Sequence, residues 1–212
     1  MKQRRSLVPT IVILLLLAVA AGAAVWLWSA GDKLAVKTEA GQVGQASGTG
    51  TPSIGGPFTL TDETGKRVTD KDFAGKYMLI YFGFTFCPDV CPTELQVMSG
   101  ALDELKTDAA KVQPIFVTID PERDTPKVLA SYVKQFNPRL IGLTGSAEDI
   151  AKIAKEYRVY YEKVKDDSSS GDYTMDHSSI IYLMGPDGGF LTFFPPGTSP
   201  EKMADKIKTF MK

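Results

Sequence analysis

The sequence contains only one histidine and two cysteines, so few of its side chains can bind soft metals or carry thiol chemistry. These residues are Cys87, Cys91 and His177. The sequence also has almost no net charge, because 24 lysine and arginine residues nearly balance 25 aspartate and glutamate residues. This balance gives no indication of nucleic-acid binding. The sequence has no internal repeat, and its 212 residues fit one globular domain with an appendage.

Long apolar runs are lacking too, except for one near the N-terminus. After a basic head over residues 1–6, the stretch from Leu7 to Trp28 has 22 residues and no charge. As a helix it would be about 33 Å long, which is enough to cross a bilayer. A cleaved signal peptide is the alternative, because residues 20–24 are small, but the apolar run continues beyond them to Trp28. We therefore predict an uncleaved transmembrane anchor over residues 7–28.

The residues around this run predict its orientation. Lysine and arginine residues precede it and two tryptophans lie at its end, so the N-terminus would stay in the cytoplasm and the rest would be exported. No obvious organellar presequence comes before the run, so we expect a single-pass protein of a bacterial inner membrane with a periplasmic domain. Residues 29–53 turn to glycine, serine, threonine and glutamine, which predicts a flexible linker. Residues 54–212 would form the folded domain.

Strand and helix patterns alternate through this domain. The segments that predict strands or hairpins are rich in β-branched and aromatic residues and lie at 57–68, 77–84, 112–119, 140–143, 159–164, 179–184 and 190–194. Helical spacing of apolar residues occurs at 93–105, 126–136, 146–157 and 201–211. Thr125 can cap the second of these helices with Pro126 at its first position, and Ser146 or Thr144 can open the third. The acidic, serine-rich residues 166–172 predict a loop. This order indicates an α/β, thioredoxin-like domain whose central sheet is mainly parallel, has helices on both faces and gains an antiparallel hairpin late in the chain.

Both cysteines belong to the segment Cys87-Pro88-Asp89-Val90-Cys91-Pro92, between the strand expected at 77–84 and a helix expected to begin near Thr93. Because proline suits the first helical position, we expect Pro92 there and Cys91 at or near the N-cap. A thiolate at this place faces the positive end of the helix dipole, which lowers the pKa of the thiol.

Three interpretations of the cysteine pair stay open on the residues alone: a structural disulfide, a redox dithiol and a metal site. A disulfide that closes so small a loop removes little chain entropy, and a domain of this size can form a good core without it. The spacing is also one residue longer than that of the usual redox Cys-x-x-Cys motif.

His177 immediately precedes the hairpin predicted at 179–194, in a segment that reads as a loop. A loop histidine is often only solvated, but in a thioredoxin-like topology this loop faces the cysteine turn. Two thiolates and one imidazole form a soft three-coordinate set that suits Cu(I), whereas a structural zinc site normally has four ligands. Met175 is a weaker candidate as an additional soft ligand.

Three charged residues follow the strand predicted at 112–119. Asp120, Arg123 and Asp124 are either plain loop and capping residues or a group that orients His177 or contacts a docking partner. The second interpretation rests on the fact that ligating imidazoles usually donate their other N–H to an oxygen.

Three segments together resemble the Sco/SenC copper chaperones of cytochrome c oxidase assembly. They are Phe82–Pro92, Asp120–Pro126 and Asp176–Ser178, the last followed by the strand that contains Tyr182 and Leu183. The resemblance covers roughly Pro57 to the C-terminus. It implies a thioredoxin-like domain on a single membrane anchor, with Cys87, Cys91 and His177 as the copper ligands.

The resemblance also implies a role as a metallochaperone rather than an enzyme. The protein would deliver copper, as Cu(I) or Cu(II), to the CuA site of oxidase subunit II. Its thiols must be reduced before loading, so a thiol reductant and an upstream copper donor are further expected partners. The alternative is a thiol-disulfide oxidoreductase that reduces the CuA cysteines of the acceptor through a Cys87–Cys91 redox disulfide. A peroxidase, suggested by Thr85 and Cys87, lacks the proline that such enzymes place before the threonine.

Overall fold

The computed structural model describes residues 54–165 and 173–211. The predicted basic head, anchor and linker lie outside the described residues, and so does the loop expected at 166–172. The described residues belong to one unit, Gly50–Lys212. Among them, no helix has both the length and the apolar composition needed to cross a membrane.

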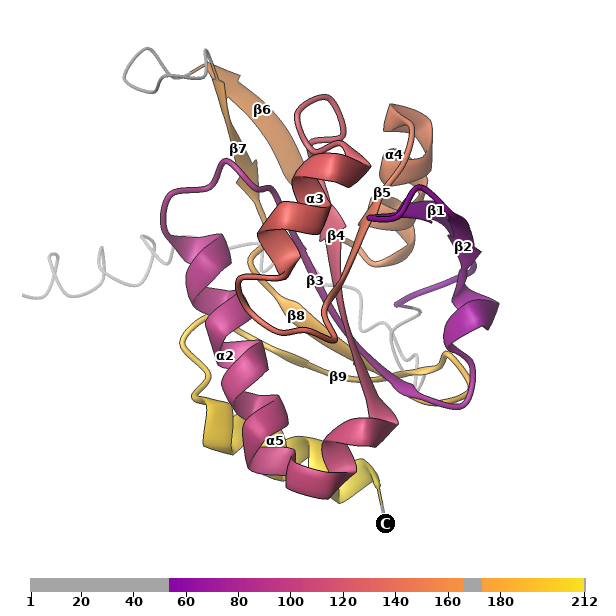
Figure 1. Ribbon diagram of the computed structural model, residues 1–212, viewed down its shortest axis with the longest axis vertical. Coiled ribbons are helices and arrows are strands. Elements are labelled where there is room, and N and C mark those ends of the chain that lie inside the picture. The colour runs from indigo at the N-terminus through magenta and orange to yellow at the C-terminus, as the bar shows by residue number, and fades with distance from the viewer. Residues whose placement is uncertain (1–53, 166–172, 212) are drawn as a thin grey trace, which may run out of the picture. The chain divides into compact units, whose positions relative to one another are not determined.

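A seven-stranded mixed sheet forms the centre of this unit, with the strand order β2-β1-β5-β4-β3-β8-β9 (Figure 1). The strands are β1 (Thr59–Asp62), β2 (Arg67–Thr69), β3 (Tyr77–Gly83), β4 (Val112–Thr118), β5 (Ile141–Thr144), β8 (Ile181–Met184) and β9 (Phe190–Phe194). In this sheet β3, β4 and β5 are parallel to one another, whereas the pairs that involve β1, β2, β8 or β9 are antiparallel. The thioredoxin-like order and the late antiparallel hairpin, β8–β9, are confirmed. The expectation of a mainly parallel sheet is wrong, because β1 and β8 also pair antiparallel with the parallel strands β5 and β3, which makes the sheet mixed.

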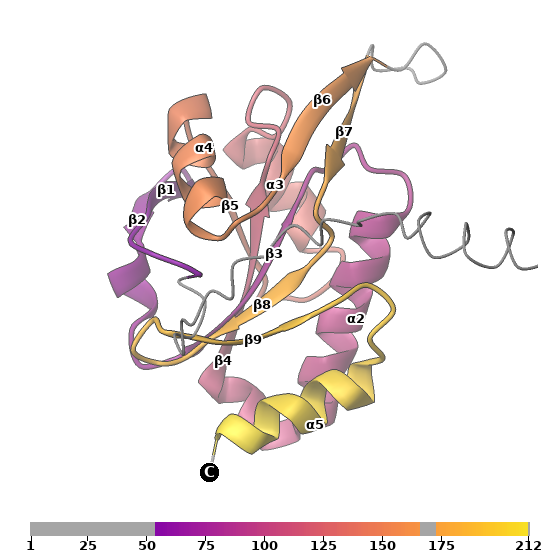
Figure 2. The same cartoon turned by 180° about the vertical axis from the view of Figure 1, so that it is seen from behind.

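Helices cover both faces of the sheet, as predicted (Figures 1 and 2). In the described part of the chain the α-helices are α2 (Val90–Leu105), α3 (Pro126–Val133), α4 (Ala147–Glu156) and α5 (Pro200–Phe210), and short 3-10 helices lie at Asp70–Phe73 and Lys106–Lys111. The chain passes from β3 to β4 to β5 in one direction across the sheet, so right-handed crossovers place α2 and α3 on the same face. It then returns through α4 on the opposite face, and α5 packs against α2.

Two of the helices begin where the sequence predicts. The Thr125 side chain accepts a hydrogen bond from the Val128 N–H, with Pro126 at the first position of α3. Ser146 caps α4 in the same way by accepting from the Asp149 N–H.

The start of α2 differs from the prediction, because its N-cap is Asp89 rather than Cys91. Cys91 and Pro92 therefore lie inside the first turn of α2. The proline is tolerated there because the first N–H groups of a helix have no partner within the helix.

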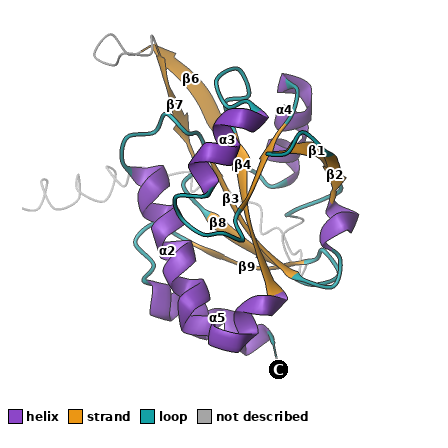
Figure 3. Cartoon of the chain, in the orientation of Figure 1, coloured by secondary structure: helices purple, strands orange, loops and turns teal. Residues whose placement is uncertain are grey.

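A second, two-stranded sheet projects beside the first and consists of β6 (Tyr161–Lys165) and β7 (Tyr173–His177) (Figure 3). The sequence predicts β6 but not β7, and the expectation that His177 lies in a loop is wrong. His177 ends β7 and pairs with Tyr161. β7 has few apolar residues, so its strand conformation depends on hydrogen bonding to β6, which local periodicity does not reveal.

Candidate metal centre

One buried carboxylate forms hydrogen bonds with both the loop that carries Cys87 and the end of β4. Asp124 is fully buried and accepts hydrogen bonds from the Thr85 N–H at 3.0 Å, the Thr85 hydroxyl at 2.6 Å and the Thr118 hydroxyl at 2.6 Å. Burial raises the pKa of Asp124, and the bonds from Thr118 and Thr85 oppose that rise. Asp124 thus holds the start of the cysteine loop at the end of β4.

The two cysteines are both free thiols, but they differ in exposure. Cys91 is fully buried against the core, whereas Cys87 is partly exposed. The Cys87 sulfur accepts a hydrogen bond from the Cys91 N–H at 3.4 Å. It therefore occupies one of the N–H groups that the first turn of α2 leaves without a helical partner.

This arrangement gives the two thiols opposite ionisation behaviour. The pKa of Cys87 is lowered to about 4, mainly by a hydrogen bond with the Cys91 thiol, and further by His177 and the Cys91 and Asp89 amides, against the effect of burial. The pKa of Cys91 is raised by its bond with Cys87 and by burial. The thiolate predicted at this helix start is therefore Cys87, not Cys91.

The His177 imidazole lies close to the Cys91 thiol, as the thioredoxin-like topology predicts. Its Nε2 atom lies 3.6 Å from the Cys91 sulfur. Its Nδ1 atom lies 3.2 Å from the Ser178 carbonyl oxygen, so an N–H at Nδ1 leaves Nε2 as the free nitrogen. The rings of Tyr81 and Phe84 contact the imidazole edge to face, at centroid distances of 6.2 and 5.9 Å. These contacts fix the orientation of the ring.

The spacing of these atoms fits a shared soft metal ion. Bond lengths of about 2.3 Å to sulfur and 2.0 Å to nitrogen, with angles near tetrahedral or trigonal, separate the two ligand atoms by about 3.5–3.8 Å. The distance of 3.6 Å between Cys91 and His177 lies in this range. Within residues 54–165 and 173–211, however, no group of three or more cysteine, histidine or acidic side chains is already arranged to hold a metal. The Cys87 thiol also forms hydrogen bonds with the Cys91 thiol and with the His177 side chain, so the three candidate ligands are in mutual contact.

Asp120 and Arg123 lie beside the site without touching His177. The Arg123 Nε donates to the Asp120 carboxylate, and the Tyr173 hydroxyl donates to the same group at 2.9 Å. Arg123 Nη1 also donates to the Tyr173 carbonyl oxygen at 2.9 Å. These bonds hold the first residue of β7, the strand that ends at His177.

The Arg123 guanidinium also connects β7 to the cysteine loop through aromatic rings. It lies 3.8 Å from the ring centroid of Tyr173 on one element and 4.9 Å from that of Phe86 on the other. Phe86 precedes Cys87 directly, and its side chain is exposed. Arg123 is therefore in contact with both segments that supply the candidate ligands.

Two further residues at the site were missed by the sequence analysis. The Tyr81 hydroxyl donates to the Cys91 sulfur at 3.7 Å, and Gly83 leaves room for the same sulfur. A tyrosine in a strand predicted to be fully buried was a usable signal, because a buried hydroxyl needs a partner. Gly83 gave no such signal, since its role depends on how closely α2 approaches β3.

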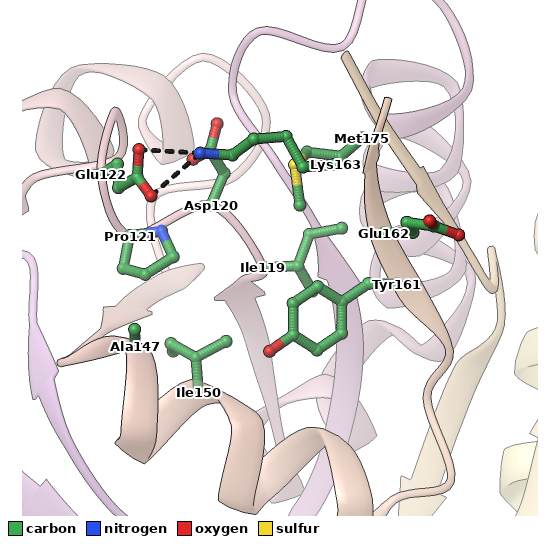
Figure 4. A pocket seen from close by; sticks show the side chains of 10 residues that line it. All are labelled: Ile119, Asp120, Pro121, Glu122, Ala147, Ile150, Tyr161, Glu162, Lys163 and Met175. Carbon is green, nitrogen blue, oxygen red and sulfur yellow. Dashed lines mark hydrogen bonds and ion pairs between the residues drawn. The ribbon is translucent and has the colours of Figure 1, made fainter. Parts of the chain in front are cut away.

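A cavity of about 300 Å3 lies next to the site, between β6, α4 and the loop after β4 (Figure 4). Its lining includes Met175, Asp120 and Tyr161, but none of the three candidate ligands. At one side of the cavity, Lys163 Nζ donates hydrogen bonds to both carboxylate oxygens of Glu122, at 2.8 and 2.9 Å. The Met175 side chain borders this cavity, so its proposed part as an additional ligand has no support in the structure.

This chain is similar to known proteins in both sequence and fold. Residues 46–212 match the family described as SCO1/SenC. Bradyrhizobium japonicum ScoI, solved with copper bound, is 50% identical, with 74% of this chain and 99% of that chain covered and a TM-score of 0.68. Arabidopsis thaliana ScoI, also with copper bound, is 45% identical, with coverages of 74% and 98% and a TM-score of 0.71.

The human protein named "Protein SCO1 homolog, mitochondrial" is 49% identical over 165 residues, which are 77% of this chain and 54% of the human protein. The chain spans about half the length of the curated relatives it matches. Because the family match covers most of the sequence and the identity to several members is high, the chain belongs to the SCO1/SenC family.

Proposed function

We propose that this protein is a copper metallochaperone in cytochrome c oxidase assembly. In this proposal Cys87, Cys91 and His177 bind one copper ion as cargo and pass it to the CuA site of oxidase subunit II. The observation that carries the proposal is the 3.6 Å approach of the Cys91 sulfur to His177 Nε2, with the Cys87 thiolate beside them. The copper in the two similar solved structures favours copper as the metal.

The unequal exposure of the ligands supports transfer by ligand exchange. Cys87 is partly exposed, whereas Cys91 is fully buried, so an acceptor thiolate would replace Cys87 first. Copper then stays bound to protein ligands throughout. Soft thiolate ligands favour Cu(I), and both thiols must be reduced before the metal enters. The expected partners are thus oxidase subunit II, an upstream copper donor and a thiol reductant.

Asp120, Arg123 and Asp124 would support the site from outside. Asp124 holds the cysteine loop through Thr85, and Arg123 with Asp120 holds the first residue of β7. Exposed Phe86, which lies against Arg123, is where a docking partner would contact this cluster.

The proposed function includes an anchor over residues 7–28, with the head over residues 1–6 in the cytoplasm. Residues 29–53 would be the linker and residues 54–212 the copper-binding domain in the periplasm of a bacterial cell. A linker of this length has a root-mean-square span of about 25 Å, which allows the domain to reach neighbouring membrane proteins.

Copper titration of the reduced full-length chain tests the proposal. The wild type is expected to retain one copper ion, and His177→Ala and Cys87→Ser are expected to bind it much more weakly. Asp176→Ala is the matched control, because Asp176 is exposed and lies beside His177 in β7. An unchanged copper affinity in His177→Ala would show that the ligand set is wrong.

The alternative function is reduction of the acceptor's CuA disulfide. It is favoured by the hydrogen bond between the partly exposed Cys87 thiol and the buried Cys91 thiol. The Cys87 thiolate would attack the acceptor disulfide and form a mixed disulfide, and the Cys91 thiolate would then release the acceptor's dithiol. Two electrons pass to the acceptor, a Cys87–Cys91 disulfide remains, and an external thiol must reduce it. His177→Ala should keep most of this activity, which separates it from copper delivery.

A further inference from the structure

Tyr81 is a fully buried tyrosine in the middle of β3, and its hydroxyl reaches the candidate metal centre. The hydroxyl donates to the Cys91 sulfur at 3.7 Å, a normal length for a bond to an atom as large as sulfur. The Tyr81 ring also contacts Phe116 and His177, with centroid distances of 6.3 and 6.2 Å. Burial of a hydroxyl in an apolar strand is costly unless the group has a partner, and here the partner is a candidate ligand.

The surroundings of Tyr81 keep its hydroxyl a donor. Burial raises the pKa of Tyr81 well above its ordinary value, so the hydroxyl retains its proton. A side-chain hydrogen bond from Ser179 lowers the pKa of Tyr81, as expected when Ser179 donates to the tyrosine oxygen. The geometry of the bond to Cys91 itself directs the Tyr81 proton to the sulfur.

We propose that the Tyr81 hydroxyl, by hydrogen bonding to the Cys91 sulfur, biases the copper site toward Cu(I). This inference rests on the proposed copper-binding function. A hydrogen bond to a thiolate withdraws electron density from sulfur and weakens its donation to the more electron-poor Cu(II) ion more than to Cu(I). Tyr81 is thus a positioning and tuning residue that acts through Cys91 rather than on the metal.

The Tyr81→Phe variant tests this role, because it keeps the ring and removes only the hydroxyl. The ratio of Cu(I) affinity to Cu(II) affinity, measured by competition with chelators, is expected to fall about three- to tenfold, the equivalent of one hydrogen bond. The sulfur-to-Cu(II) charge-transfer band is expected to move to longer wavelength. A role in folding alone would move neither quantity.

Two control variants remove hydroxyl groups that do not touch a ligand. Tyr132→Phe removes a buried hydroxyl that has no hydrogen-bond partner among the described residues, although its ring also contacts Phe116. Tyr77→Phe removes a bond to the Phe210 carbonyl oxygen, in the same strand as Tyr81. Both are expected to leave the affinity ratio and the absorption band unchanged.

Ser179→Ala provides a second test should Tyr81→Phe fold poorly. It removes the donor that orients the Tyr81 hydroxyl, so a smaller shift in the same direction is expected. If Tyr81→Phe folds and keeps the wild-type ratio of Cu(I) to Cu(II) affinity and the wild-type charge-transfer band, this inference is wrong. The proposed copper-binding function would not be affected by that result. If Tyr81→Phe does not fold, a Ser179→Ala variant with an unchanged ratio of Cu(I) to Cu(II) affinity would also show that the inference is wrong. A wild type that retains no copper would overturn both this inference and the proposed function.

Discussion

The Cys91 sulfur fills the space that Gly83 leaves empty. A methyl group added at Gly83 would lie 2.8 Å from this sulfur and 2.9 Å from the Phe116 ring. Real carbon atoms do not approach so closely, and both neighbours are fully buried. The last residue of β3 must therefore be glycine for the first turn of α2 to pack against the sheet as it does.

Replacement of Gly83 by alanine is therefore expected to displace Cys91. We expect a loss of about 1–3 kcal/mol in the free energy of unfolding, as for other overpacked cores, together with weaker copper binding. Denaturant unfolding and copper titration measure the two effects. Gly142→Ala is the control, because its methyl group would meet Leu129 and Val133 of α3 at 3.1 Å, away from the site. Equal losses of copper affinity in both variants would contradict this explanation.

Glu94 is expected to make the stability of the protein depend on pH. This α2 residue is buried, and within the described residues its Oε2 atom has no hydrogen-bond partner. Burial raises the pKa of Glu94 above its ordinary value of 4.5, against a hydrogen bond from the Gly197 amide. Protonated Glu94 therefore contributes its full stabilisation below pH 4.5. This contribution is lost as the pH rises through the raised pKa that Glu94 has in the folded protein.

Glu94→Gln should remove this pH dependence, because glutamine does not titrate. Urea unfolding at several pH values between 4.5 and 7.5 is expected to show a flatter profile for the variant than for the wild type. Glu104→Gln, at an exposed position of the same helix, should keep the wild-type profile. Identical slopes for Glu94→Gln and the wild type would rule out Glu94 as the source.

Asp124→Asn is expected to loosen the cysteine loop. The amide retains one acceptor oxygen, while the carboxylate now accepts three hydrogen bonds from Thr85 and Thr118. We expect a loss of about 1–3 kcal/mol in unfolding free energy, since a buried donor is left without a partner. Asp187→Asn, in an exposed turn, should cost less. Comparable costs measured by denaturant unfolding would count against this role of Asp124.

Two ion pairs beside β6 and β7 are expected to contribute very differently to the free energy of unfolding. Arg123→Met leaves the Asp120 carboxylate, only 2% exposed, without its cation, and a loss of about 3–5 kcal/mol in unfolding free energy is expected. Lys163→Met breaks a pair with Glu122 whose side chains are 44% and 68% exposed, and the expected loss is far smaller because water screens exposed charges. Denaturant unfolding of both variants measures the two losses. Similar losses of unfolding free energy would contradict the expected difference between the buried and the exposed ion pair.

The sequence by itself determined most of the secondary structure and the place of the two thiols. Apolar, β-branched runs predicted β3 and β4, and the Thr125-Pro126 and Ser146 signals predicted the starts of α3 and α4, because these patterns act within a few residues. Residue order also placed Cys87 and Cys91 at the junction of β3 and α2.

Only the tertiary structure decided how the site is assembled. His177 lies 86 positions from Cys91, and its approach to 3.6 Å depends on the pairing of β7 with β6. The same packing lowers the pKa of Cys87 and raises that of Cys91, and it brings Tyr81 and Gly83 into contact with the buried sulfur. These features arise from contacts between distant segments, and local sequence patterns do not encode the distances between such segments.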